Sequence, residues 1–185
     1  MALAFAATAI SIVACTSSSP SGDTSPQPAA SPTRAAPWGL DATLVPESEA
    51  EIDAVLAAMP PEIDGVPGEV QGNEIDYGDR GMGEMAGSME TFLRVMTLGG
   101  EEYGTGAAFV GAIVQNGGID IEAQELGADA PLVYVAGSTP AGGSTYFSVM
   151  WAAPDAPYVM LIQATSDAQR LALVRAFQDA AASIG

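Results

Sequence analysis

The chain has 185 residues, of which 48% are hydrophobic and 15% are charged, with 23 acidic residues against 5 arginines. It contains no histidine and no lysine, which excludes a Ser-His-Asp triad, an imidazole metal site, a Schiff base and a phosphate-loop lysine. A single cysteine excludes an internal disulfide and a four-thiolate zinc site, and the length predicts one folded domain.

The N-terminal segment, residues 1–14, is an uncharged run dominated by alanine and aliphatic side chains. A helix needs about 20 apolar residues to cross roughly 30 Å of bilayer hydrocarbon, so this run is too short to span a membrane. A short apolar run of this kind is typical of a secretory signal peptide, and we therefore expect residues 1–14 to be removed on export.

The signal ends at the only cysteine, in the order Ile12, Val13, Ala14, Cys15. This segment resembles the lipobox of bacterial lipoproteins, in which an aliphatic residue and a small residue precede the cysteine that is lipidated. The resemblance covers residues 1–15 only. It implies cleavage before Cys15, acylation of Cys15 (palmitate among the chains) and attachment to the extracytoplasmic face of the cell membrane. The alternatives are an ordinary signal peptide and a buried N-terminal helix that contains a cysteine by chance.

Residues 15–46 read as a disordered tether rich in serine, proline and alanine, because so few large apolar side chains cannot offset the entropy lost on ordering. Trp38 and Leu40 are the exceptions, and we expect them to form the first contacts with the domain. The remaining residues, 47–185, are predicted to form a single globular α+β domain.

Three helices are predicted, at 48–59, 83–97 and 166–184. Capping boxes mark the starts of the first and the last, since Ser48 is followed by Glu51 and Ser166 by Gln169. The middle helix rests on methionines and a phenylalanine at steps of three and four, namely Met82, Met85, Met89, Phe92 and Met96.

The last predicted helix has distinct inner and outer faces. Its buried stripe is expected to hold Leu171, Val174, Phe177, Ala181 and Ile184. Its outer face is expected to hold Arg170, Arg175, Gln178 and Asp179.

Four or five strands are predicted between these helices. Apolar and polar residues alternate at 119–124 and 144–151, and short apolar runs occupy 132–136 and 158–164. Residues 107–115 form an apolar run before an Asn-Gly-Gly turn, which is a strand signal, but over 101–115 the choice between strand and helix stays open. The connections are too short for parallel crossovers, which indicates an antiparallel meander packed with helices.

The negative charge is concentrated in one half of the domain. Residues 41–129 hold 19 acidic residues and 2 arginines, whereas residues 130–185 hold 3 and 2. Such a surface would repel nucleic acid and anionic lipid headgroups, and it would tolerate Ca²⁺ or a basic partner. The simpler interpretation is a solubilising surface.

Four sequence patterns are candidate sites, and none of them leads to an assignment. Residues 81–86 fit a G-x-G-x-x-A dinucleotide fingerprint outside its usual strand–helix context. The methionines could bind Cu(I) or line a groove for an apolar ligand, but they are more typical of a core. The oxygen-bearing side chains considered as calcium ligands are Asn73, Asp76 and Asp79, and those considered as an acid–base pair are Glu122 and Glu125.

The sequence therefore predicts a lipid-anchored, acidic extracytoplasmic domain that acts by binding or by structural presence at the cell envelope. No catalytic residue, cofactor or metal is expected, and Cys15 is the only assigned site. The predicted partners are the membrane, through the lipid anchor, and a protein or small apolar ligand, but no nucleic acid. The alternatives are a carrier of a lipid or small apolar ligand and a carboxylate-dependent hydrolase.

Overall fold

The structure is a computed structural model that describes residues 37–78, 91–98, 103–127, 129–141 and 144–185. These residues belong to one compact unit. The predicted signal peptide, Cys15 and most of the predicted tether lie outside the described residues.

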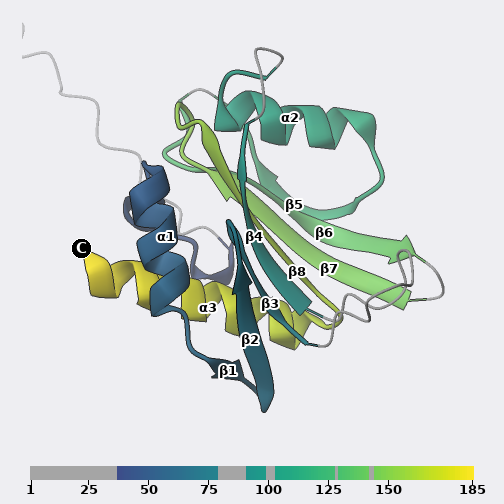
Figure 1. Ribbon diagram of the computed structural model, residues 1–185. Coiled ribbons are helices and arrows are strands. Elements are labelled where there is room, and N and C mark those ends of the chain that lie inside the picture. Colours follow the sequence, from purple (N-terminus) through teal and green to yellow (C-terminus); the bar gives the residue numbers. More distant parts are fainter. Residues whose placement is uncertain (1–36, 79–90, 99–102, 128, 142–143) are drawn as a thin grey trace, which may run out of the picture. The chain divides into compact units, whose positions relative to one another are not determined.

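One open antiparallel sheet of eight strands forms the centre of the fold, in the order β1-β2-β3-β4-β8-β7-β6-β5 (Figure 1). The α+β class is confirmed, whereas the expected four or five strands were too few. The strands are β1 (Glu62–Ile63), β2 (Val66–Gln71), β3 (Glu74–Tyr77), β4 (Thr91–Thr97), β5 (Asp120–Glu125), β6 (Val133–Ala141), β7 (Ser144–Ala152) and β8 (Tyr158–Ala164).

The sheet consists of two meanders that share a seam. Strands β1 to β4 pair in chain order, and so do strands β5 to β8. The two sets join where β4 pairs with β8, from Thr91 opposite Ala164 to Thr97 opposite Tyr158. Between the meanders the chain passes through α2 (Gly106–Asn116), which carries it from β4 at the centre of the sheet to β5 at its edge.

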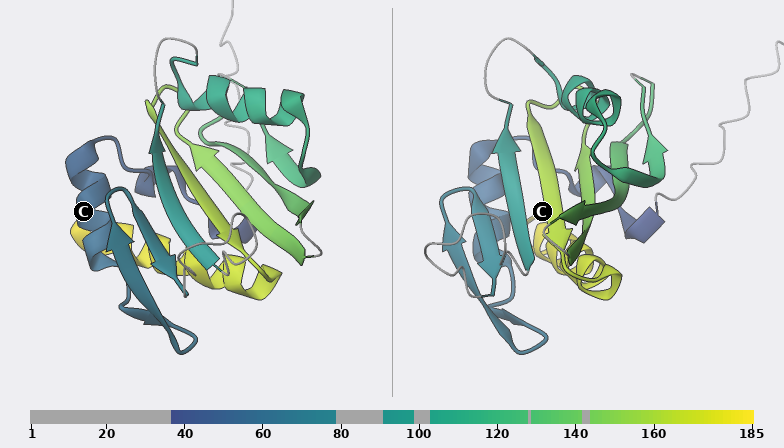
Figure 2. Two further views of the ribbon diagram at one scale, coloured as in Figure 1. Left: turned by 45° about the vertical axis from the view of Figure 1, so that its right-hand side comes forward. Right: turned by 90° about the vertical axis from the view of Figure 1, so that its right-hand side faces the viewer.

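Helices cover both faces of the sheet, which makes three layers (Figure 2). Helices α1 (Glu49–Ala58) and α3 (Asp167–Ile184) pack on one face, together with two short 3-10 helices, η1 (Pro37–Gly39) and η2 (Ala42–Leu44). Helix α2 packs on the other face. The side chains of Ser48 and Ser166 accept hydrogen bonds from the third residue of their helices, so both predicted N-termini are confirmed.

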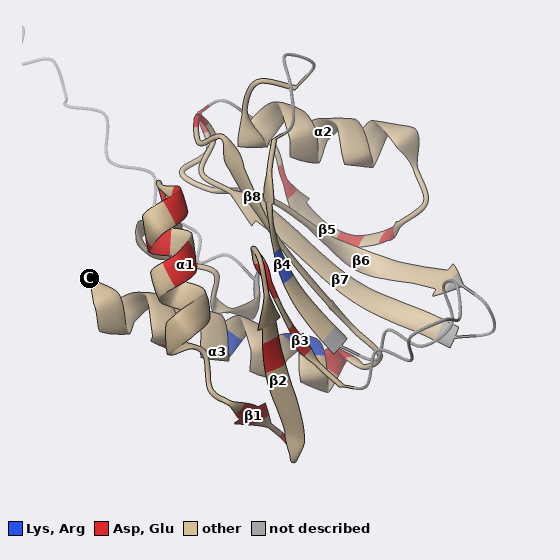
Figure 3. Cartoon of the chain, in the orientation of Figure 1, with Lys and Arg blue, Asp and Glu red and all other residues tan. Residues whose placement is uncertain are grey.

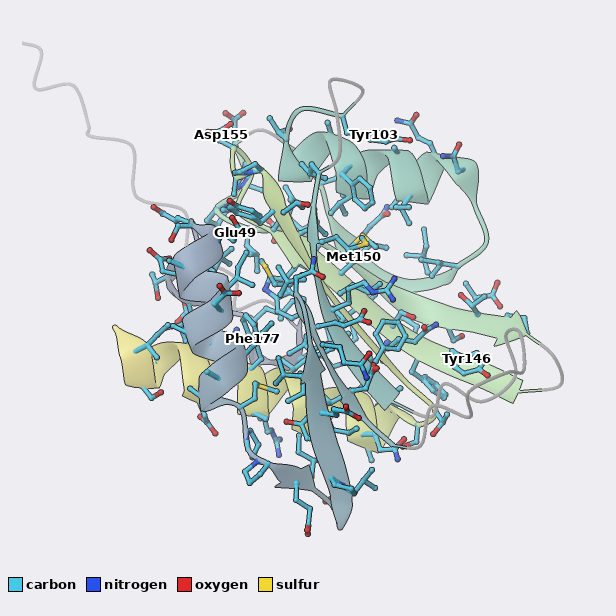
Figure 4. The ribbon with its side chains drawn as sticks, in the orientation of Figure 1. Glu49, Tyr103, Tyr146, Met150, Asp155 and Phe177 are labelled. Atoms are coloured by element: carbon cyan, nitrogen blue, oxygen red, sulfur yellow. The ribbon has the colours of Figure 1, made fainter. Side chains whose placement is uncertain are left out.

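The larger core lies between the sheet and α1 and α3. Trp151 of β7 and Phe177 of α3 are fully buried and meet edge to face, with ring centroids 5.3 Å apart. Figure 4 labels Phe177 at this interface. The smaller core lies under α2, where Val110 packs over buried aliphatic side chains of β6 to β8, among them Val133, Val135 and Met150.

The predicted helix 83–97 is wrong over its last seven residues, which form β4, while residues 83–90 lie outside the described part of the chain. Phe92 and Met96 match a helical spacing, but Leu93 and Val95 alternate with Arg94 as a strand requires. Leu93 and Val95 are buried in the larger core, so pairing with β3 and β8 prevails over the spacing.

The choice that the sequence left open over residues 101–115 is resolved in favour of a helix, with residues 101–102 outside the described part of the chain. Helix α2 begins after Thr105, whose hydroxyl accepts a hydrogen bond from the backbone N–H of Ala108. The Asn-Gly-Gly sequence ends this helix rather than turning a hairpin, with Gly117 at a φ of 72°.

The first meander accounts for most of the missed strands. Strand β2 is polar and contains proline and glycine, so its sequence carries no strand signal. Its glycine has a steric role, since a Cβ on Gly68 would lie 2.6 Å from the ring of Tyr77 on β3. Tyr77 is buried, and its hydroxyl donates a 2.7 Å hydrogen bond to the carbonyl oxygen of Pro60.

Part of the predicted tether belongs to the folded unit. Leu40 and Val45 are buried, and Trp38 packs against the same core, so the expected docking of Trp38 and Leu40 is confirmed. The packing therefore begins upstream of the expected boundary at residue 47. The sequence places this boundary too late because so few large apolar residues are spread along the segment before residue 47.

The acidic side chains gather on α1, on the first meander and on β5, as Figure 3 shows. Few of the described acidic residues lie on α3 or on β6 to β8. None of the helices in the described residues is long and apolar enough to cross a membrane.

Candidate functional site

Arg170, near the start of α3, is 1% exposed and holds α3 against the second meander. Its guanidinium donates to the backbone carbonyls of Gly137 and Ser148, at 3.3 and 3.0 Å. It also pairs with the carboxylates of Glu122, at 2.7 Å, and Asp167, at 2.5 Å. These partners offset the cost of removing the charge from water.

Two aromatic rings flank this guanidinium. Its central carbon lies 4.8 Å from the ring centroid of Trp38 in η1 and 5.7 Å from that of Phe147 in β7. Cation–π contacts of this kind contribute about 2 kcal/mol when the cation is desolvated. Arg170 therefore fixes the position of the Trp38 indole on the surface of α3.

The outer face predicted for α3 is half right. Arg175 and Asp179 are exposed as expected, but Arg170 and Gln178 are buried. Polarity suggested an outward position for both, whereas their partners lie in distant parts of the chain that the periodicity of one helix does not reveal. Ile184, expected in the buried stripe, is 42% exposed at the end of the helix.

Trp38 adopts an unusual backbone conformation, with a φ of 61° and a ψ of 9°. Among the described residues the only other non-glycine residue with a positive φ is Asp64, in the tight turn between β1 and β2. Such a conformation costs a bulky residue about 1–3 kcal/mol and persists only where its surroundings impose it. Backbone strain of this kind is concentrated at binding and catalytic sites.

A surface cleft of about 440 Å³ opens between Trp38 and α3. Its floor is a single stripe of the helix, because Leu171, Arg175 and Gln178 follow one another at steps of four and three. The residues that line it are Trp38, Gly39, Leu171, Arg175, Gln178 and Asp179.

Gln178 is 9% exposed, and its two amide atoms differ in their environment. Its Oε1 accepts a 3.1 Å hydrogen bond from the backbone N–H of Asp41, which ties the segment after η1 to α3. Because that N–H can only donate, the carboxamide oxygen must face it. Its Nε2 is left buried without a hydrogen-bond partner, a state that costs about 1–3 kcal/mol.

Two charged side chains stand at the cleft. Within the described part of the chain, Arg175 and Asp179 have no ion-pair or hydrogen-bond partner, in contrast to Arg94, which bonds Glu74 at 2.6 Å. The cleft thus combines the indole of Trp38, the free guanidinium of Arg175 and the free carboxylate of Asp179, with the buried amide of Gln178 at its base.

The structure does not bring the candidate calcium ligands together. Asn73 lies in the turn between β2 and β3, and its amide donates to the backbone carbonyl of Val95. Asp76 is buried within β3, and Asp79 lies outside the described residues. Among the residues that the structure describes, no group of three acidic or cysteine side chains is placed to hold a metal ion.

The other candidate patterns are the acid pair, the dinucleotide fingerprint and the methionines. Glu122 forms the ion pair with Arg170, which gives it a structural partner, while Glu125 pairs with Tyr134 in the sheet register. Residues 81–86 and three of the four methionines lie outside the described residues, whereas Met96 packs beneath α2.

The cleft itself was not found from the sequence. Its only visible signal was the pair of large apolar residues, Trp38 and Leu40, in an otherwise small and polar segment. Comparison with protein-family models finds no match, and comparisons with curated proteins and with solved structures find no significant match either.

Proposed function

We propose that this protein is a lipid-anchored extracytoplasmic domain that acts by binding a small ligand at the cell envelope, in the cleft between Trp38 and α3. The observation that carries the proposal is the buried, unpartnered Nε2 of Gln178 beside an indole that is held in a strained conformation. A ligand that displaces the atoms covering this amide and accepts its hydrogen bond would remove the cost of leaving it unpaired.

The cleft has the attributes of a small-molecule site. Its volume of about 440 Å³ falls within the range of about 300–1,000 Å³ that is usual for ligand pockets. Arg170 buttresses one face of Trp38, so the indole does not need to be ordered when a ligand arrives. Arg175 and Asp179 provide directional contacts at the rim.

Binding is favoured over catalysis by the composition of the lining. The six described residues that line the cleft include no serine, threonine, tyrosine or cysteine, so among them there is no hydroxyl or thiol nucleophile. Among these described residues Asp179 is a single free carboxylate, without the second acid that a carboxylate-dependent hydrolase would need.

The carrier alternative receives less support from the packing. A carrier requires space between the sheet and its helices, of about 300 Å³ or more. The residues at both interfaces contact one another, and their exposed fractions are 8% or less. The cleft in contrast is open at the surface and has a polar rim.

Membrane attachment is tested with Cys15→Ala in the full-length protein expressed in its own host. We expect the wild-type protein to fractionate with membranes and to leave them only in detergent, and the variant to lose this partitioning because it has no acyl chains. A variant that still fractionates with membranes would contradict lipidation at Cys15.

Ligand binding is tested by native mass spectrometry of the wild type, Arg175→Ala and Glu49→Gln, each purified from the same host. Arg175 lines the cleft, and Glu49 is an exposed residue on α1 outside it. We expect a bound mass in the wild type and in Glu49→Gln that is reduced in Arg175→Ala. Identical spectra for all three proteins would contradict the cleft as the binding site.

A further inference from the structure

The side chains around the cleft also restrict the chemistry of its ligand. We infer that the cleft binds a neutral saccharide, with a sugar ring against Trp38 and its hydroxyl groups toward Gln178, Arg175 and Asp179. This inference rests on the proposed binding function and names the class of ligand. Three features of the cleft carry it: the flat indole, the mixture of donors and acceptors, and the balance of charge.

The flat wall comes from Trp38. One face of its indole lies on the guanidinium of Arg170, which is 1% exposed, so this contact fixes the plane of the ring. The rest of the half-buried indole borders the cleft. A pyranose ring offers a matching surface, because the C–H groups on one of its faces form a flat apolar patch that a rigid aromatic ring covers well.

The polar groups demand a ligand that both accepts and donates hydrogen bonds. The Nε2 of Gln178 and the guanidinium of Arg175 only donate, whereas the carboxylate of Asp179 only accepts. A hydroxyl group donates one hydrogen bond and accepts others, so adjacent hydroxyls of a sugar satisfy both kinds of partner at once. A purely apolar ligand would strip water from these groups without replacing their hydrogen bonds.

The balance of charge argues for a neutral ligand. Arg175 and Asp179 offset each other within the cleft, and the charge of Arg170 is already matched by Glu122 and Asp167. Phosphate and carboxylate ligands are therefore disfavoured.

The openness of the cleft indicates modest affinity. A ligand that contacts Trp38 and one stripe of α3 buries only part of its surface. Its contacts must still offset the translational and rotational entropy that is lost on binding. We expect dissociation constants of about 1 mM for disaccharides.

The test titrates the full-length protein in detergent with maltose, cellobiose or N,N′-diacetylchitobiose and follows tryptophan emission. The chain has two tryptophans, and Trp151 is fully buried, so Trp38 is the one that reports on the cleft. We expect a saturable shift in emission with at least one disaccharide. Sorbitol, a linear polyol without a flat ring face, and inorganic phosphate should give none. Trp38→Phe should abolish the signal.

Two variants test the polar contacts by isothermal calorimetry. Arg175→Ala and Asp179→Asn change exposed side chains that have no partner in the described structure, so both should fold normally and bind about tenfold more weakly. Asp53→Asn is the matched control for Asp179→Asn, because it removes one negative charge from an exposed position on α1. It should bind as the wild type does.

The inference is overturned if none of the three disaccharides produces a saturable shift, if the shift survives in Trp38→Phe, or if phosphate binds in place of sugar. Its failure is distinguishable from failure of the proposed function. A bound mass that depends on Arg175 in native mass spectrometry but is not a saccharide would preserve the binding site and refute only the class of ligand.

Discussion

The two faces of the sheet are packed with different chemistry. Under α2, Val110 meets valine and methionine side chains, and the cluster is almost wholly aliphatic. Under α1 and α3, the buried set includes Trp151, Phe177 and the polar side chains of Arg170 and Gln178. Aliphatic packing tolerates exchange if volume is kept, whereas buried polar groups require particular partners. The α3 face is therefore the more specific of the two, and the cleft lies on it.

The largest effect should come from the aromatic core of the α3 face. Phe177→Ala removes a fully buried ring that meets Trp151 edge to face, and it should lower the free energy of unfolding by about 3–5 kcal/mol. Urea unfolding followed by circular dichroism measures the change. Phe177→Leu should lose less. A loss near zero for the alanine variant would mean that this helix does not carry the core.

Arg170→Met tests the polar half of the same face. The variant leaves the carbonyls of Gly137 and Ser148 without their donor, while the partly exposed Glu122 and Asp167 return to water. We expect a loss of about 3 kcal/mol in the free energy of unfolding. Arg170→Lys should recover less than half, since an ammonium lacks the planar fork. A fully stable lysine variant would contradict this account.

Val110→Ala tests the aliphatic face. This residue is fully buried beneath α2, and its truncation should cost about 2 kcal/mol in unfolding free energy. Because the clusters around Val110 and Phe177 share no residue, the double variant should lose the sum of the single losses to within about 0.5 kcal/mol. A larger deviation would show that the two faces are coupled through the sheet.

Tyr77 is a buried polar group of the α3 face that responds to pH. Burial raises the pKa of Tyr77 to about 12, above the usual value of about 10. The folded state thus holds the phenolic proton more tightly than the unfolded state, so stability should fall as the pH rises from about 10 toward 12. Tyr77→Phe should lose about 1 kcal/mol at neutral pH with the hydrogen bond to Pro60. Its unfolding free energy should then change less over this alkaline range.

The smallest effect is expected for Arg175→Ala, five residues beyond Arg170 on the same helix. Arg175 is exposed and unpaired within the described structure, so its loss should change the unfolding free energy by less than about 0.5 kcal/mol. Thermal unfolding of both arginine variants provides the comparison. A large loss would show that Arg175 has a structural role, which would weaken its assignment to the cleft.

Local signals predicted the second meander and the two capped helices well. Strands β5 and β7 alternate apolar and polar residues, β8 matches its predicted bounds, and Ser48 and Ser166 mark the starts of α1 and α3. These features depend on residues near one another in the sequence. For β7, β8 and the two helices the local pattern and the tertiary packing favour the same structure. In β5 they differ, because the register shifts between Ile121 and Ala123 and Ile121 is 43% exposed.

Distant partners decided the elements that the sequence did not predict. Strand β4 is stabilised between β3 and β8, and β8 lies more than sixty residues further along the chain. Arg170 is buried because its guanidinium donates hydrogen bonds to backbone carbonyls of β6 and β7. Gln178 is buried because its amide oxygen accepts a hydrogen bond from Asp41 in the N-terminal segment. None of these partners produces a periodic sequence pattern near the residue whose position it determines.

The order of elements along the chain has a consequence for folding during synthesis. Helix α3, residues Asp167–Ile184, covers one face of a sheet whose strands all precede it in the sequence. Until this helix has been synthesised, Trp151 and its neighbours lack their cover, so the larger core closes only after every strand has been made.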